Sequence, residues 1–176
     1  MKARLLQTLF TAQVIFCSTF ILAAESNKDI RALQEQNIMS VLFQQTSAEG
    51  LASSLQTYNT AKNNLDKALA DPTWSALPGQ SMFPYKKPSI ILDIDETVLD
   101  NLAYQARGIL DGTSYPTGWS AWGNEVAATE VPGAKDFLNY AQSKGVTIFY
   151  ITNRVAELKN ATQQNLTKLG IPWDQS

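Results

Sequence analysis

The stretch SIILDIDETVLDN at residues 89–101 decides the fold, because an apolar run ends directly in a group of carboxylates. The run SIILDI is continuous rather than alternating, which is typical of a parallel strand covered on both faces. In open parallel sheets the functional crevice lies beyond the carboxyl ends of the strands. Asp93 and Asp95 follow this strand end, and residues two apart in extended chain point the same way. The stretch therefore predicts a polar site at the end of a strand.

Two carboxylates crowded at one site repel each other unless a cation lies between them. Mg²⁺ would relieve that repulsion and shield an incoming phosphate, with Asp93 and Asp95 as its ligands. Asp93 would then be the nucleophile that forms an acyl phosphate, while Asp95 protonates the leaving oxygen and later activates water. The simpler alternative is that Asp95 or Thr97 caps a following helix.

The chain after residue 130 predicts an α/β fold. Residues 132–145, PGAKDFLNYAQSKG, have the proline and glycine that commonly bracket a helix. The run VTIFYIT at 146–152 predicts a second buried strand, and residues 156–172 predict a helix closed by Gly170. Strand, crossover helix, strand and helix together indicate a Rossmann-like parallel sheet.

An N-terminal region at 25–88 precedes this core. Residues 29–45 and the segment that follows them both predict helices, with Thr46 and Glu49 as a capping box for the second helix. The proline-rich residues 72–88 predict a loop that leads to the first strand. We therefore expect a helical pair in front of the sheet.

Residues 1–24 have the layout of a secretory signal peptide: Lys2 and Arg4, an apolar stretch, and then Ala23 and Ala24. We expect cleavage after Ala24 and an exported, periplasmic or secreted protein. The alternative is a lipid anchor on Cys17, which Phe16 disfavours because small residues normally precede a lipidated cysteine.

Composition excludes several classes of function. A formal net charge of −2, without a stripe of basic residues, argues against polymeric nucleic acid as a partner. The sequence contains 0 histidines, which removes histidine bases and the commonest transition-metal ligand. Carboxylates and other oxygen donors are left, and these suit a hard ion such as Mg²⁺.

The two strand ends resemble the first two signatures of the haloacid-dehalogenase superfamily of phosphatases. IILDIDETVLDN resembles the apolar strand that ends in DxDx(T/V), and VTIFYITNR resembles the strand that ends in Ser or Thr, here Thr152. With QQTSAE, WSAW and VPGAKDFLNYAQSKG, the chain is similar to the secreted acid phosphatase branch, subfamily IIIB, typified by bacterial lipoprotein-e acid phosphatases and 5′-nucleotidases.

This resemblance implies an Mg²⁺-dependent phosphomonoesterase that acts outside the cytoplasm on small phosphorylated substrates, including nucleoside monophosphates. It implies that Thr152 and Asn153 hold the transferred phosphoryl group. Arg154 either faces phosphate or is a solvated residue at the start of a helix. Residues 89–176 would form the core, with an insertion at 102–130 over the crevice. Its aromatic rings either stack on a substrate ring or pack into the core; the stacking candidates are Tyr104, Trp119 and Trp122.

The resemblance also implies a lysine and an acidic signature on later elements, and neither follows the last predicted helix. Two parallel strands alone make an incomplete sheet with an open edge. We therefore expect a C-terminally truncated chain. Two functions stay open: the phosphatase described above, and an exported remnant that binds a phosphorylated ligand without turnover.

Overall fold

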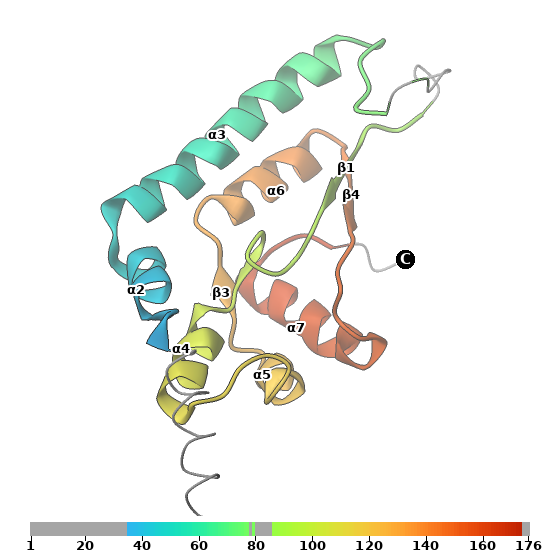
Figure 1. The fold of residues 1–176 in the computed structure, drawn as a ribbon. Helices are drawn as coiled ribbons and strands as arrows, with labels where there is room; N and C mark the ends of the chain where they lie inside the picture. Colours follow the sequence, from blue (N-terminus) through green and yellow to red (C-terminus); the bar gives the residue numbers. More distant parts are fainter. Residues whose placement is uncertain (1–34, 78, 80–85, 174–176) are drawn as a thin grey trace, which may run out of the picture.

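The computed structural model describes residues 35–77, 79 and 86–173 (Figure 1). The predicted signal peptide and Cys17 lie outside these residues. The described part begins with two helices, α2 (Ile38–Thr46) and α3 (Ala48–Ala70), as the sequence predicted. Within the described ranges, no helix is both long enough and apolar enough to cross a bilayer.

The start of α3 differs from the prediction by one residue. Ser47 is the N-cap, and its hydroxyl oxygen accepts a hydrogen bond from the Gly50 N–H at 2.8 Å. Thr46 is instead the last residue of α2, and its hydroxyl donates back to the Leu42 carbonyl at 2.7 Å. The predicted capping box at Thr46 is therefore wrong, because the Thr46 hydroxyl is already bonded within the preceding helix.

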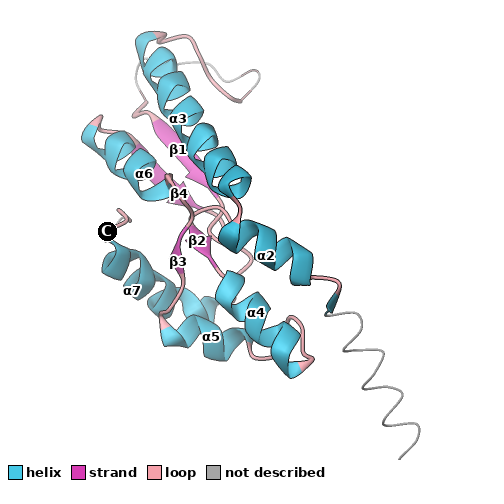
Figure 2. Cartoon of the chain, turned by 90° about the vertical axis from the view of Figure 1, so that its left-hand side faces the viewer, coloured by secondary structure: helices cyan, strands magenta, loops and turns pink. Residues whose placement is uncertain are grey.

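The core is a mixed α/β arrangement around a small parallel sheet. Strand β1 (Ser89–Leu92) pairs with β4 (Thr147–Tyr150) in parallel, and the register places Ile91 opposite Phe149. Helix α6 (Ala134–Ser143) packs on one face of this sheet, and α3 packs against α6 (Figures 1 and 2). The predicted parallel pair and crossover helix are confirmed.

Close packing of α3 against α6 depends on Gly133, the N-cap of α6. Its φ angle is +90°, in the left-handed region that glycine adopts readily. A β-carbon at this position would come within 3.1 Å of the Tyr58 Cβ atom on α3. Glycine thus allows the turn into α6 and the approach of the N-terminal helix to the core.

A second, antiparallel pair of strands brackets the helices of the insertion. Strand β2 (Leu99–Asp100) pairs antiparallel with β3 (Thr129–Glu130), a pairing that the sequence did not predict. Helices α4 (Leu102–Asp111) and α5 (Trp119–Glu125) lie between them in the chain. After β4, the chain forms a short 3₁₀ helix, η2 (Ala156–Leu158), and then α7 (Lys159–Leu169), which ends at Gly170 as predicted.

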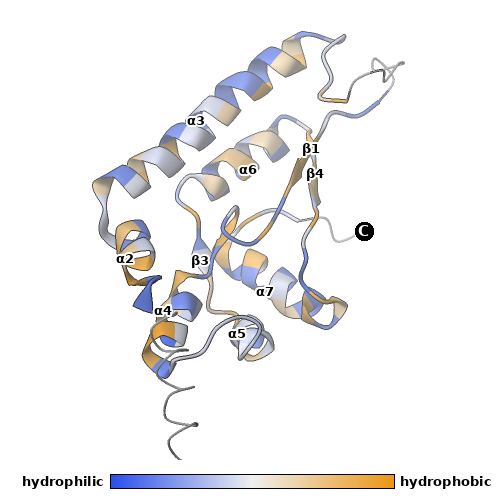
Figure 3. Ribbon diagram, viewed as in Figure 1, coloured by the Kyte–Doolittle hydropathy of each residue, from blue (hydrophilic) through white to orange (hydrophobic). Residues whose placement is uncertain are grey.

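One face of the β1–β4 sheet is buried and the other is open. Ile90, Leu92, Ile148 and Tyr150 pack against the hydrophobic core. On the opposite face Ile91 is 64% exposed and Phe149 is 53% exposed, and Ile151 just beyond β4 is 65% exposed. Both strands are apolar along their length (Figure 3), and this pattern predicted that other elements would cover both faces of the sheet. In the part of the chain that the structure describes, only the α6 face is covered.

Candidate active site

The two parallel strands end side by side, which brings both predicted signatures to one edge of the sheet. The Ile151 N–H donates to the Leu92 carbonyl at 2.9 Å, immediately before Asp93 and Thr152. Asp93 is exposed, and its Oδ1 atom accepts a hydrogen bond from the Ile94 N–H at 2.7 Å. The Asp93 carboxylate is thus held by a hydrogen bond at one oxygen, and solvent or a ligand can reach it.

A tight loop after Asp93 turns the chain back toward β2. The Ile94 carbonyl accepts hydrogen bonds from the Val98 N–H at 2.8 Å and from the Leu99 N–H at 2.9 Å. Glu96 has a positive φ angle of 54°, and its N–H donates to the Leu99 carbonyl at 2.8 Å. The next helix, α4, begins only after Asn101. The alternative in which Asp95 or Thr97 caps a helix is therefore wrong.

Asp95 lies inside this loop and forms an ion pair with Arg154. The Nη2 atom of Arg154 lies 2.6 Å from Asp95 Oδ1, and Arg154 Nε lies 3.0 and 3.1 Å from Oδ1 and Oδ2. The Arg154 side chain is only 4% exposed, whereas the Asp95 side chain is 22% exposed. Arg154 is thus not a solvated residue at a helix start, and that interpretation is wrong. Its charge is buried and paired.

Asn101 joins Asp95 to the insertion. This residue is fully buried, and its Nδ2 atom donates to Asp95 Oδ1 at 2.8 Å. Its Oδ1 atom accepts from Trp122 Nε1 at 2.8 Å and from Arg154 Nη2 at 3.3 Å. The Asn101 N–H donates to Glu96 Oε1 at 3.1 Å. A single buried amide therefore connects the Asp95 loop to α5.

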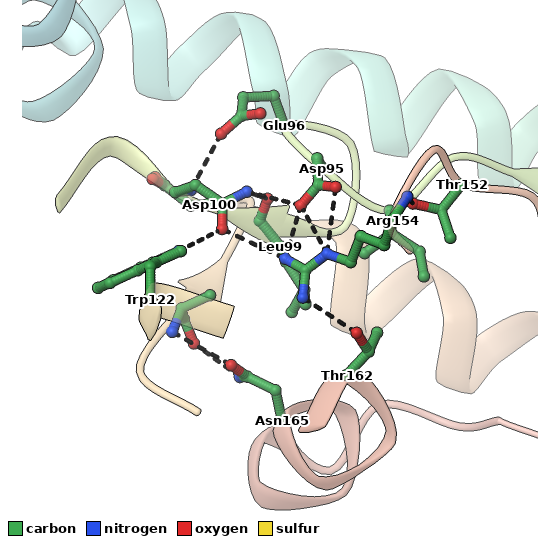
Figure 4. A network of polar contacts seen from close by, with 12 residues as sticks. Asp95, Glu96, Leu99, Asp100, Trp122, Thr152, Arg154, Thr162 and Asn165 are labelled. Carbon is green, nitrogen blue, oxygen red and sulfur yellow. Dashed lines mark hydrogen bonds and ion pairs between the residues drawn. The ribbon is translucent and has the colours of Figure 1, made fainter. Parts of the chain in front are cut away.

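Arg154 is anchored from further directions, as Figure 4 shows. Its Nη1 atom donates to Thr162 Oγ1 on α7 at 3.0 Å, and its backbone N–H donates to Thr152 Oγ1 at 3.1 Å. The guanidinium carbon lies 5.3 Å from the ring centroid of Trp119. Contacts from α5 and α7 thus hold the guanidinium that binds Asp95, and Thr152 holds the Arg154 backbone.

Glu96 lies on the other side of the same loop. Desolvation raises the pKa of Glu96, and the neighbouring charges of Asp95 and Asp100 act in the same direction. Hydrogen bonds from Asn101 oppose this shift. Glu96 also lines a groove of about 780 Å³ between the α2–α3 corner and the β2–β3 strands, together with Asp100 and Glu130.

The aromatic residues of the insertion pack against one another. Tyr104 and Trp122 are buried, and the Tyr104 hydroxyl donates to the Thr117 carbonyl at 3.0 Å. The ring centroids of Tyr104 and Trp119 are 5.0 Å apart in an edge-on arrangement. Trp119 is half-buried and lies beside Arg154, so among the three stacking candidates it has the most accessible ring. Stacking on a substrate stays a prediction for all three.

The predicted metal ligands differ in their surroundings. Asp93 is exposed, whereas both carboxylate oxygens of Asp95 already accept hydrogen bonds from Arg154. Oxygen donors of this kind fit Mg²⁺, which is often held by one or two carboxylates together with substrate phosphate and water. Within the described residues, no group of three or more acidic, histidine or cysteine side chains is arranged to hold a metal ion. Asp93 is therefore the better placed of the two ligands.

The sequence interpretation missed the connecting residues of the site. Thr152 lies half-buried at the end of β4, and Asn153 next to it is exposed. Asn101 stands at the end of the quoted stretch, but nothing in the sequence shows that its amide is buried beside Asp95. Thr162 sits inside a predicted helix without any distinguishing signal. The sequence did single out Asp95, Trp119, Trp122 and Arg154, but not the contacts that join them.

Comparisons with known proteins agree with this geometry. Two solved structures of the class C acid phosphatase from Bacillus anthracis, one of them a crystal structure with tungstate bound, are similar to this chain with a TM-score of 0.70 and 44% sequence identity. The similarity covers 80% of this chain but only 54–55% of those chains, so the chain spans little more than half their length. The family model for subfamily IIIB, the acid phosphatases, matches residues 1–176. The chain therefore belongs to subfamily IIIB of the haloacid-dehalogenase superfamily.

Proposed function

We propose that this protein is a phosphomonoesterase that works through an aspartyl phosphate. The observation that carries this proposal is the exposed Asp93 carboxylate at the end of β1, beside the β4 end that leads to Thr152, in a chain of the acid phosphatase subfamily. Tungstate is a tetrahedral oxyanion, like phosphate, and its presence in the Bacillus anthracis structure supports an oxyanion site in this fold.

The chemistry follows in two steps. A carboxylate oxygen of Asp93 attacks phosphorus, so that an O–P bond forms while the bond to the leaving oxygen breaks, and Asp95 donates a proton to that oxygen. Asp95 then takes a proton from water, which attacks phosphorus, releases inorganic phosphate and restores the Asp93 carboxylate. Thr152 and Asn153 would hold the phosphoryl oxygens during both steps.

A divalent metal belongs to this proposal, since enzymes of the superfamily generally use one. The Asp93 carboxylate would hold it, because both oxygens of the other predicted ligand, Asp95, already accept hydrogen bonds from Arg154. Mg²⁺ is our choice because the donors are oxygens. When bound, it supplies positive charge that offsets the repulsion between the carboxylates and the phosphate. Nucleoside 5′-monophosphates are the substrates that we propose, with Trp119 as the most accessible ring for the base.

Export is a further part of the proposal. The arrangement of Lys2, Arg4, the apolar stretch and Ala24 supports cleavage after Ala24 and activity in the periplasm or outside the cell. Edman sequencing of the protein recovered from the periplasm or the medium is expected to begin at Glu25. An intact N-terminus, or a lipid on Cys17, would contradict this proposal.

Hydrolysis assays test the activity. The purified chain is incubated with p-nitrophenyl phosphate and with adenosine 5′-monophosphate, each with Mg²⁺ or with a chelator. Asp93→Asn is expected to abolish turnover, because the amide cannot form the acyl phosphate. Asp111→Asn, which removes an exposed carboxylate at the end of α4, is the matched control and is expected to retain activity.

The alternative function gives a different result. A folded chain that binds tungstate or phosphate in calorimetry, but hydrolyses neither substrate, would be a binding protein without turnover. In that case the residues in this chain are not sufficient for catalysis.

A further inference from the structure

We propose that Arg154 is the positioning residue for Asp95, and that it directs the Oδ2 oxygen of Asp95 toward the leaving group. This inference rests on the proposed function, in which Asp95 transfers the proton. The two oxygens of the Asp95 carboxylate then have different roles. Hydrogen bonds from the protein hold Oδ1, and Oδ2 transfers the proton.

The hydrogen bonds around Asp95 are unequal. Oδ1 accepts from Arg154 Nη2 at 2.6 Å, from Asn101 Nδ2 at 2.8 Å and from Arg154 Nε at 3.0 Å. Oδ2 accepts only from Arg154 Nε, at 3.1 Å, among the hydrogen bonds within the described chain. A carboxylate has roughly four lone-pair sites on its two oxygens. Oδ1 is therefore saturated, and Oδ2 has room for a proton or a water molecule.

Arg154 can hold this orientation because it is itself held. Its guanidinium is planar and presents several donors in a fixed fork, so its contacts with Asp95, Asn101 and Thr162 are coupled. The Trp119 ring lies beside it, and only 4% of the side chain is exposed. A rotation of the Asp95 carboxylate would break the bonds that Oδ1 accepts from Asn101 and from Arg154 Nη2.

A purely structural ion pair is the competing explanation. Loss of a buried pair destabilises a protein, and that effect would lower activity equally for every substrate. A misplaced proton donor acts differently. It slows esters with a poor leaving group, which need protonation, much more than esters with a good one. The dependence of the loss on the leaving group separates the two explanations.

The experiment compares p-nitrophenyl phosphate, which has a good leaving group, with glycerol phosphate, which has a poor one. Arg154→Lys keeps the charge but loses the fork, and Thr162→Val removes only the Nη1 partner of Arg154. We expect both variants to lose kcat/KM, which reports the transfer of the phosphoryl group to Asp93, more for glycerol phosphate than for p-nitrophenyl phosphate, with the difference for Arg154→Lys about tenfold or more. Arg107→Lys is the control. The Arg107 guanidinium lies 4.9 Å from the Trp122 ring centroid, but within the described chain its hydrogen bonds go to Glu125 and not to Asp95, Asn101 or Arg154.

A second measurement does not depend on turnover. In ¹H–¹⁵N spectra, the Arg154 Nε–H signal is expected to shift in Asp95→Asn, and the Trp122 indole signal is expected to shift in Arg154→Lys, because Asn101 joins the two groups. Selective loss with poor leaving groups together with these shifts supports the proposal. Equal losses of kcat/KM for both esters, or an Arg154 signal that does not shift in Asp95→Asn, overturns it. A folded wild-type chain without any turnover overturns the proposed function first, and the role of Arg154 in proton transfer with it.

Discussion

The indole N–H of Trp122 donates to the side-chain oxygen of Asn101 at 2.8 Å, and both residues are buried. This bond joins α5 to the loop that carries Asp95, because the amide nitrogen of Asn101 donates to Asp95 at 2.8 Å. The insertion is therefore connected to the predicted active site by a polar contact in the core. Its aromatic residues contribute to the position of Asp95 even without contact with a substrate.

Replacement of Trp122 by phenylalanine tests this connection. The ring can still fill much of the space, but Asn101 Oδ1 keeps only the longer bond from Arg154 at 3.3 Å. We expect the free energy of unfolding to fall by about 1–3 kcal/mol, which is the usual cost of a buried polar group that loses its partner. The free energy of unfolding is measured by urea titration, with circular dichroism as the signal.

Trp119→Phe is the matched control, because Trp119 is only half-buried and, among the residues that the structure describes, its indole makes no hydrogen bond to Asn101 or Asp95. We expect a smaller loss in this variant. A loss as large as that of Trp122→Phe would mean that aromatic packing, and not the bond to Asn101, dominates.

The main elements of the core could be predicted from the sequence because their signals are local. The apolar runs before Asp93 and Thr152 predict the strands. Pro132 and Gly145 bracket one helix, and Gly170 ends the other. The β2–β3 pair could not be predicted. Its strands have two residues each, too few to show any alternation.

The candidate site could be predicted only in part, for a similar reason. Asp93 and Thr152 follow recognisable strand ends, so a short window of sequence identifies them. The partner of Asp95 is 59 residues away, and the pairing arises only when β1 and β4 come together. Whether an arginine after a strand faces solvent or a buried carboxylate is decided by tertiary packing, here by Thr162 and Trp119.

The N-cap of α3 provides a prediction about stability. Ser47→Ala is expected to lower the free energy of unfolding by about 0.5–2 kcal/mol, because the Gly50 N–H loses its acceptor at the start of the helix. Thr46→Ala removes an exposed hydroxyl that bonds only within α2, and we expect less than about 0.5 kcal/mol. Thermal or urea unfolding compares the stability of the two variants. If the Thr46 variant were the less stable one, the helix would start where the sequence prediction placed it.

Tyr150 provides a prediction about alkaline pH. Burial raises the pKa of Tyr150 above the ordinary value of 10.0, and the nearby Tyr58 adds to the shift. The folded protein thus holds this proton more tightly than the unfolded chain does. The resulting stability is present below pH 10 and is lost as pH rises above the unfolded pKa.

Tyr150→Phe removes this linkage together with the hydrogen bond to the Pro172 carbonyl at 2.7 Å. We expect the variant to be less stable at pH 8, and the gap between variant and wild type to narrow as pH rises from about 9.5 to 11. Tyr115→Phe, at an exposed ring, is the control. A gap that stays constant across this range would show that ionisation of Tyr150 is not coupled to folding.

The open face of the β1–β4 sheet provides the last prediction. Leu138 on α6 is fully buried, so Leu138→Ala is expected to cost about 2–5 kcal/mol of unfolding free energy. Ile91 is 64% exposed on the uncovered face, and Ile91→Ala is expected to cost no more than about 1 kcal/mol, mainly through lower strand propensity. Urea unfolding at several protein concentrations measures both losses and any dependence on self-association. A cost for Ile91→Ala close to that for Leu138→Ala would show that this face is covered when the protein is in solution.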